Sequence, residues 1–165
     1  MSWYKDLAKV IEKHNGKRNI YRSVNGQNIL YLERYYLTRT PYFEQMLHCF
    51  HLGDTGPLHD HPSDFYNCIL ETGYLEHTPE GIFKREVGYK GFKAAEELHK
   101  VELLPGTNGN VWTLFTMMKR RRKWGFMTEN GWVDAFDYMK RTGTYETNTL
   151  PEMYEYGIFP SKIIT

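Results

Sequence analysis

The chain has 165 residues, of which 41% are hydrophobic and 16% aromatic, so it can bury a core of ordinary size and is most simply one domain. Its formal net charge of +1 excludes a global electrostatic attraction to nucleic acid or to an anionic membrane. No apolar run reaches the roughly 20 residues of a membrane helix, and the N-terminal residues lack the apolar region of a signal peptide. We therefore expect a soluble, cytoplasmic protein.

The first predicted element is a short amphipathic helix over residues 2–14, with Ser2 as its candidate N-cap and an Asn-Gly pair as its stop signal. Residues 16–27 are polar and contain a second Asn-Gly pair, which is typical of a tight turn. We assign residues 1–27 to an N-terminal helix and a linker that pack on the following domain.

From residue 28 the sequence changes to short apolar segments separated by Gly, Pro and Asn at intervals of about ten residues. The predicted strands cover residues 28–38, 42–52, 65–70, 73–77, 81–89, 95–103, 111–118, 123–128 and 132–139. Many short strands with such turns favour an all-β antiparallel barrel or sandwich over a helical bundle. We assign residues 28–141 to this barrel and residues 142–165 to a C-terminal tail, which either packs over the barrel or forms an arm.

A histidine pair stands out in the run GPLHDH at residues 56–61. Successive side chains of a strand point to opposite faces, so His59 and His61 can aim both imidazoles at one point, as in a metal site. The alternative is that they are ordinary surface or core histidines. The apolar run that follows, closed by Gly73, favours the metal site, and His99 on a later predicted strand offers a third imidazole.

The run at residues 56–61, with the apolar strand and Gly73 that follow, resembles the first motif of the cupin superfamily, and especially its thiol dioxygenase branch. The resemblance covers residues 28–128. It implies a cupin-like β-barrel or jelly roll, a mononuclear metal and, since cupins often dimerise, a homodimer. His99 would be the second-motif histidine, although the Pro-x-Gly expected ahead of it is absent and Pro-Gly at residues 105–106 follows it instead.

Another departure from the cupin pattern concerns the metal ligands. Many cupins carry a ligating glutamate four or five residues after the second histidine, where this chain has Phe65 and Tyr66. Asp64 is one alternative ligand. The thiol dioxygenases use three histidines and leave three coordination positions open. That arrangement implies the ligand set His59, His61 and His99.

Three imidazoles suit several divalent metals, so we favour Fe(II) and keep Zn, Ni or Mn as alternatives. The favoured reaction is oxygenation by a non-haem Fe(II) dioxygenase. An alternative is a metal-dependent lyase, isomerase or hydrolase in which Tyr66 or Asp64 moves a proton. Another is a non-catalytic cupin that serves as a ligand-binding or structural module. Asp60 should point away from the metal, either as a turn carboxylate or as a group that orients a ligand imidazole.

Residues 119–123 are five consecutive cations, which form either a solvated turn or an anion-binding patch. If Trp124 faces the barrel interior, strand alternation turns Arg120 and Arg122 the same way. Either arginine, or Arg34 on an early predicted strand, could bind a carboxylate or phosphate. We therefore expect a small anionic substrate held by these arginines and Trp124.

Two further histidines and both cysteines lie in apolar runs. His48 and His51 should point to opposite faces of their strand, and we interpret both as structural, with His51 as an alternative ligand if His99 is not one. Cys49 and Cys68 are expected to be reduced, buried thiols without a disulfide. The sequence near Cys49 contains neither an obvious base nor a helix N-terminus, so we do not expect Cys49 to be a nucleophile.

Overall fold

The computed structural model describes residues 2–144. In chain order its elements are α1 (Trp3–Lys13), β1 (Lys17–Val24), β2 (Gln27–Arg39), β3 (Phe43–Phe50), β4 (Phe65–Glu71), β5 (Tyr74–Thr78), β6 (Gly81–Arg85), β7 (Lys90–Lys93), β8 (Lys100–Glu102), β9 (Val111–Met118), β10 (Gly125–Thr128), β11 (Gly131–Asp134) and α2 (Ala135–Thr142). No helix in this part of the chain is long and apolar enough to cross a membrane.

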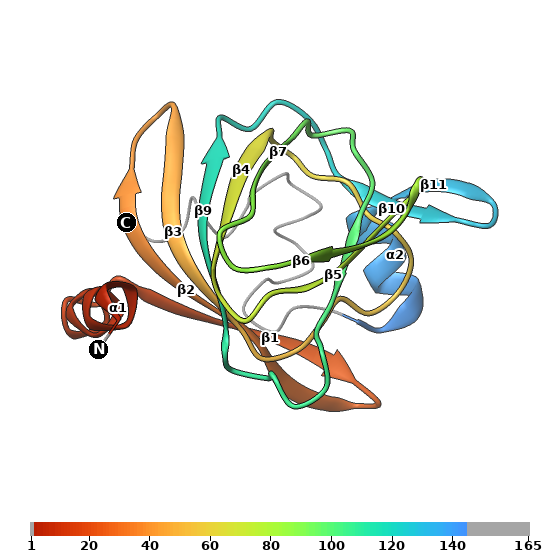
Figure 1. Ribbon diagram of the computed structural model, residues 1–165. Coiled ribbons are helices and arrows are strands. Elements are labelled where there is room, and N and C mark those ends of the chain that lie inside the picture. Colours follow the sequence, from red (N-terminus) through yellow and green to blue (C-terminus); the bar gives the residue numbers. More distant parts are fainter. Residues whose placement is uncertain (1, 145–165) are drawn as a thin grey trace.

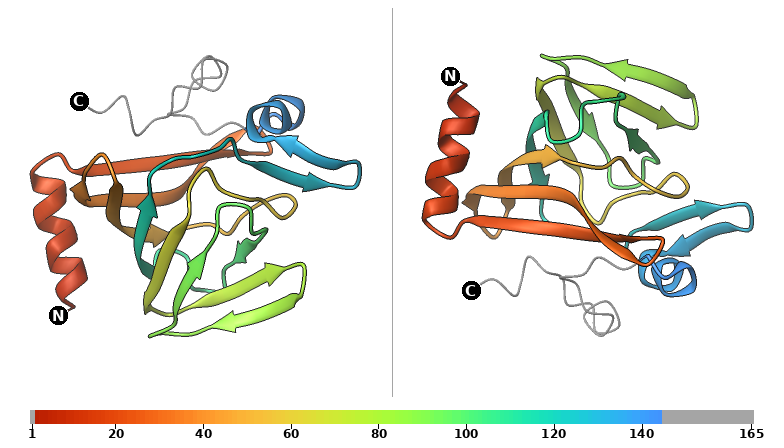
Figure 2. Two further views of the ribbon diagram at one scale, coloured as in Figure 1. Left: turned by 90° about the horizontal axis from the view of Figure 1, so that it is seen from above. Right: turned by 90° about the horizontal axis from the view of Figure 1, so that it is seen from below.

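The strands form two walls of an antiparallel barrel (Figures 1 and 2). One wall is a six-stranded sheet in the order β1-β2-β3-β9-β4-β7. The other combines a three-stranded sheet, β6-β5-β8, with the hairpin β10-β11. Backbone bridges from His59 to His99 and to Phe126 connect the small sheet with this hairpin. The predicted all-β antiparallel barrel with a short N-terminal helix is thus confirmed.

The β1–β2 hairpin corrects the prediction for residues 17–24, which we had assigned to a linker. Asn25 and Gly26 both have positive φ angles, 50° and 76°, as the predicted tight turn requires. The segment before them is nevertheless a full strand, paired with β2 at the edge of the large sheet. Its polar composition concealed the alternation, because the inward positions include Arg18 beside the apolar Ile20.

Other strand boundaries also differ from the predicted ones. The strand predicted over 132–139 stops at Asp134, whose carboxylate accepts a hydrogen bond from the backbone N–H of Phe136 and caps α2. The strand predicted over 95–103 is reduced to β8, and β7 was not predicted. The predicted tail beyond residue 144 lies outside the described residues.

Helix α1 covers the outer face of the large sheet (Figure 1). Tyr4 and Ala8 pack with Tyr35, Leu47 and Trp112 in a buried cluster. The Tyr4 ring lies 5.6 Å from the Trp112 ring, and the Tyr35 ring stacks on Trp112 at 5.7 Å. Because the helix closes this face, the opposite face of the same strands is left to line the interior of the barrel.

Both cysteines are free thiols, as predicted. Cys49 is buried in the cluster beneath α1, whereas Cys68 is only partly buried, which differs from the prediction. Burial raises the pKa of Cys49 to about 12. This thiol therefore stays protonated near neutral pH, consistent with the expectation that it is not a nucleophile.

The contact between α1 and the sheet predicts a large effect of Trp112→Ala. This substitution removes a buried indole between two tyrosine rings and should lower the free energy of unfolding by about 3–5 kcal/mol. Urea denaturation followed by circular dichroism measures the loss. Trp3→Ala is the control, because Trp3 is 57% exposed and its loss should change stability by less than about 0.5 kcal/mol. Equal effects of the two substitutions would contradict the assigned packing.

Candidate metal centre

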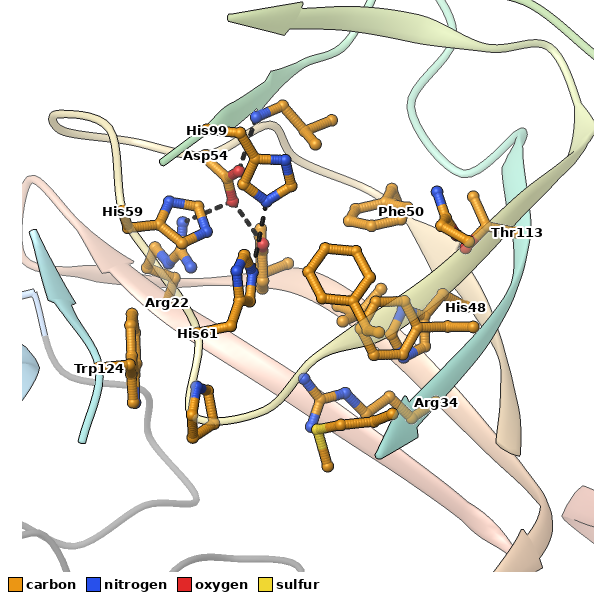
Figure 3. Close-up of a pocket in the computed structure, with 18 of the residues that line it drawn as sticks. Arg22, Arg34, His48, Phe50, Asp54, His59, His61, His99, Thr113 and Trp124 are labelled. Atoms are coloured by element: carbon orange, nitrogen blue, oxygen red, sulfur yellow. Dashed lines mark hydrogen bonds and ion pairs between the residues drawn. The ribbon is translucent and has the colours of Figure 1, made fainter. Parts of the chain in front are cut away.

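Three histidines converge on the inner side of the barrel wall (Figure 3). One ring nitrogen from each of His59, His61 and His99 lies within 4.8 Å of the other two. The Nε2 atoms of His61 and His99 are 3.3 Å apart. The structure thus brings together the three imidazoles of the predicted ligand set.

Backbone hydrogen bonds explain why residues 40 positions apart in the sequence meet here. The N–H of His59 donates to the carbonyl of His99, and the N–H of His99 donates back to His59, both at 2.9 Å. The N–H of His61 donates to the carbonyl of Ala95, also at 2.9 Å. The histidine segment is therefore held as a strand-like connection whose alternate side chains point into the barrel.

One distance and two pKa shifts in the donor set are compatible with a divalent metal. Two nitrogens that bind one ion at about 2.1 Å in a tetrahedral arrangement lie about 3.4 Å apart, close to the 3.3 Å between the two Nε2 atoms. Burial lowers the pKa of His59 to about 4 and that of His61 well below its usual range. Both imidazoles are therefore neutral near pH 7, as metal ligation requires.

A buried carboxylate fixes the orientation of His99. Glu76 on β5 is 2% exposed, and its Oε1 lies 2.7 Å from Nδ1 of His99. Arg85 and Lys93 also contact this carboxylate, at 2.8 and 2.9 Å. These partners outweigh burial and lower the pKa of Glu76 to about 2. The bond to Nδ1 leaves Nε2 of His99 directed at the other two histidines, which is the usual carboxylate–histidine arrangement at metal sites.

Asp60 lies between the two histidines of the motif and points away from them, as predicted. Its Oδ1 accepts from the N–H of Gly125 at 2.7 Å, and its Oδ2 accepts from Nε1 of Trp132 at 2.9 Å. Arg122 forms an ion pair with Oδ2 at 2.7 Å. Asp60 thus anchors the histidine segment to β10 and β11 from behind.

The histidines line a cavity of about 220 Å³ between the two walls (Figure 3). Its apolar surface includes the rings of Phe50, Phe65, Phe115, Trp124 and Phe126. Four arginines also line it, namely Arg18, Arg22, Arg34 and Arg120. Among the described residues the only acidic side chain in this lining is Asp54. The excess of cations favours an anionic ligand.

Three of the four residues predicted to bind substrate line this cavity: Arg34, Arg120 and Trp124. Arg122 does not, because besides pairing with Asp60 it donates to the backbone carbonyls of His61 and Ala95. Alternation had placed Arg122 with Arg120, but residues 119–124 form no strand, so the alternation does not apply. Arg122 holds the histidine loop and does not face a ligand.

The two residues predicted to be catalytic lie outside the cavity. Tyr66 is 52% exposed and packs against Phe92, with ring centroids 5.0 Å apart. Asp64 accepts hydrogen bonds from Arg121 and from the N–H of Ala95, both at 2.7 Å. Neither placement fits a proton-transfer role at the histidines, since both side chains point out of the barrel. Nor does Asp64 belong to the group of potential metal ligands.

His48 and His51 take opposite faces of the sheet, as predicted. His48 lines the cavity. His51 lies on the other face, where its Nε2 is 2.7 Å from Glu33 and 3.9 Å from the Cys49 sulfur. His51 therefore cannot replace His99 as a ligand, because the sheet separates it from the cavity.

Several residues of the site were not predicted, and their sequence signals differ in strength. Glu76 lies two residues after the buried Tyr74 on the same face of a short strand, so an inward charge could have been expected. Arg18 and Arg22 share the inward face of a strand that was interpreted as a linker. Asp54 sits in a loop and accepts from the Tyr31 hydroxyl and the Val101 N–H, and no local pattern marks it.

Comparison with known proteins supports the fold. A cupin 2 conserved barrel domain protein from Rhodopseudomonas palustris superposes with a TM-score of 0.54 over 76% of this chain and 85% of its own, at 14% identity. The polyketide cyclase RemF from Streptomyces resistomycificus gives a TM-score of 0.50 over 66% and 78%, at 17% identity. No model of a known protein family matches the sequence, and no curated protein matches it. The chain thus has the fold of cupin-superfamily proteins.

Proposed function

We propose that this protein is a mononuclear metal-dependent enzyme that acts on a small anionic molecule. The observation that carries the proposal is the convergence of three imidazoles on a cavity that four arginines also line. His59, His61 and His99 would hold the metal, and Glu76 and Asp60 would keep these ligands in place. A bound divalent ion would supply Lewis-acid or oxygen chemistry beside the substrate.

Within this proposal we favour an Fe(II) dioxygenase. A site with three histidine ligands leaves coordination positions for a chelating substrate and for oxygen. In this role the chain's own groups have only to bind and orient the substrate and to exclude water. The aromatic rings around the histidines and the arginines on the large sheet can do both.

The alternative is a lyase, isomerase or hydrolase that uses a Zn, Ni or Mn ion as a Lewis acid. Such a reaction needs a group that moves a proton, and the placements of Tyr66 and Asp64 leave this role to others. Asp54 lines the cavity and its charge contributes to the pKa of His59, so it is the nearest candidate base. Its pKa is lowered by neighbouring charges and hydrogen bonds, which weakens it as a base. The other alternative remains a non-catalytic cupin that binds a ligand.

We also propose a cytoplasmic homodimer. The free thiols of Cys49 and Cys68 are compatible with a reducing compartment. Tyr66 and Phe92 pack against each other with tilted rings at the β7 edge of the large sheet, where they are 52% and 53% exposed, and they offer an apolar surface for a second copy.

Metal analysis tests the proposed centre. Protein purified without oxygen should contain about one equivalent of a divalent metal, and the variant His59→Ala/His61→Ala should contain almost none, because it keeps one imidazole of three. His77→Ala is the control, since His77 pairs with Glu102 outside the site. Mass spectrometry of the metal content measures all three proteins.

Oxygen consumption with a panel of thiols and carboxylates separates the enzyme classes. Iron together with substrate-dependent oxygen uptake would support the dioxygenase, whereas zinc or nickel without uptake would support Lewis-acid chemistry. A metal-free wild type, together with no loss of function in the His59→Ala/His61→Ala variant, would contradict both enzyme proposals. The non-catalytic binding module would then be the remaining alternative.

The carboxylate behind His99 gives a second prediction. Glu76→Gln keeps the shape of the side chain but removes the negative charge of the carboxylate that faces Nδ1 of His99. Metal affinity should therefore fall about 10- to 100-fold. Competition with a chromophoric chelator measures this affinity. Glu102→Gln is the matched control, because Glu102 makes a similar 2.6 Å contact with His77 on the neighbouring strand. Unchanged affinity in a folded Glu76→Gln protein would contradict the assigned role of Glu76.

A further inference from the structure

A row of polar side chains crosses the large sheet on the cavity side, far from the histidines in the sequence. Arg18 on β1 is directly opposite Arg34 on β2, Arg34 is opposite His48 on β3, and His48 is opposite Thr113 on β9. All four line the cavity. We call them the polar row.

Arg18, His48 and Thr113 of the polar row are buried, Arg34 is partly buried, and the row has unused hydrogen-bonding capacity. His48 is 4% exposed and Thr113 is 1% exposed. Nε of Arg34, Nε2 of His48 and Oγ1 of Thr113 are buried without a hydrogen-bond partner, and so is Oδ1 of the nearby Asn67. A buried donor or acceptor without a partner costs free energy comparable to a lost hydrogen bond. Several of them together in a cavity indicate a ligand that would satisfy them.

The charges of the polar row indicate the sign of that ligand. Like charges directly opposite each other on neighbouring strands are destabilising, and Arg18 is nevertheless only 8% exposed. Asp54 is the only acidic side chain among the described residues that line the cavity. It already accepts hydrogen bonds from the Tyr31 hydroxyl and the Val101 N–H and pairs with Arg22. Burial and the adjacent Arg34 lower the pKa of His48, which keeps it neutral and able to donate or accept. An oxyanion facing both arginines would form charge-assisted hydrogen bonds with them.

Aromatic rings separate the polar row from the three histidines. The Phe65 ring lies 4.6 Å from His61 and 4.8 Å from Phe115, and Phe115 in turn stacks on His48 at 4.8 Å. Figure 3 shows Arg34, His48 and Thr113 on one side of the pocket. The candidate metal ligands His59, His61 and His99 lie on the other side. The two polar regions are thus opposite ends of one cavity with an apolar middle.

We propose that the polar row is an oxyanion subsite, and that the substrate carries a carboxylate or phosphate at this end and a metal-coordinating group at the other. Arg18 and Arg34 bind the oxyanion, and Thr113 and His48 add hydrogen bonds to it. The two-ended substrate rests on the metal-dependent function proposed above, whereas the oxyanion subsite does not depend on a metal.

Thermal unfolding in the presence of anions tests the subsite. Inorganic phosphate and succinate are titrated separately into the full-length protein, as purified and after chelation, because a ligand that binds the folded state raises its melting temperature. The two probes distinguish a phosphate from a carboxylate source. We expect at least one of them to stabilise the wild type with or without metal. Arg18→Gln and Arg34→Gln should each lower the affinity for the stabilising anion about 10- to 100-fold.

Two further variants make the result specific. Thr113→Val keeps the size of the side chain but removes its hydroxyl. It should lower the affinity for the anion by a smaller factor than the loss of an arginine does. Arg39→Gln is the control and should leave anion binding unchanged, because Arg39 pairs with Glu44 and does not line the cavity.

Three outcomes would overturn the subsite: no anion-dependent shift in the wild type, a shift only in metal-loaded protein, or a shift that persists in both arginine variants. A marked loss of stability in both arginine variants with no change in anion affinity would show purely structural arginines. If the protein binds no metal but phosphate or succinate still binds through Arg18 and Arg34, the subsite stands and the metal-dependent function fails.

Discussion

The candidate site depends on the reciprocal backbone hydrogen bonds between His59 and His99. These two 2.9 Å bonds connect the small sheet to the loop after β3, and the bridge from His59 to Phe126 continues the wall into β10. The same residues thus close the barrel and supply two of the three imidazoles. Because the backbone of each histidine is already fixed by wall formation, little conformational entropy remains to be lost when the side chains converge on a ligand.

Two acidic residues near the site, Asp60 and Glu76, support the histidine segment and the ring of His99. Asp60 contacts β10 through the Gly125 N–H, β11 through Trp132 and the preceding loop through Arg122, and Glu76 fixes the ring of His99 through Nδ1. Both carboxylates are almost fully buried. Burying a carboxylate is costly unless it is paired and hydrogen-bonded, and each has cationic partners that meet this requirement. The consequence is a candidate ligand set of three imidazoles held in place by buried, charged neighbours.

The sequence predicted the barrel and the three histidines because those features have local signals. Strand alternation, Gly and Pro turns and the spacing of His59 and His61 are properties of short segments. The strand β1 was missed because inward arginines conceal its alternation, and Arg122 was misplaced because alternation was extended into a segment that is not a strand. Tyr66 follows the correct alternation but faces outward, which no local pattern distinguishes. Partners across the barrel, such as Glu76 for His99, become visible only in three dimensions.

The charge balance of the cavity relates its two ends to each other. Neutral imidazoles do not reduce the charge of a divalent ion, so a loaded centre would add two positive charges to a lining that already holds four arginines and, among the described residues, a single acid. Asp54 alone cannot balance this excess in a partly apolar cavity, where charges interact more strongly than in water. An anionic substrate would supply the missing charge. Metal and substrate would then favour each other's binding, and by linkage the effect is reciprocal. On the proposed function, arginines at one end and imidazoles at the other would form one electrostatic unit, in which the polar row would set the affinity for the anion and the metal centre would set its orientation.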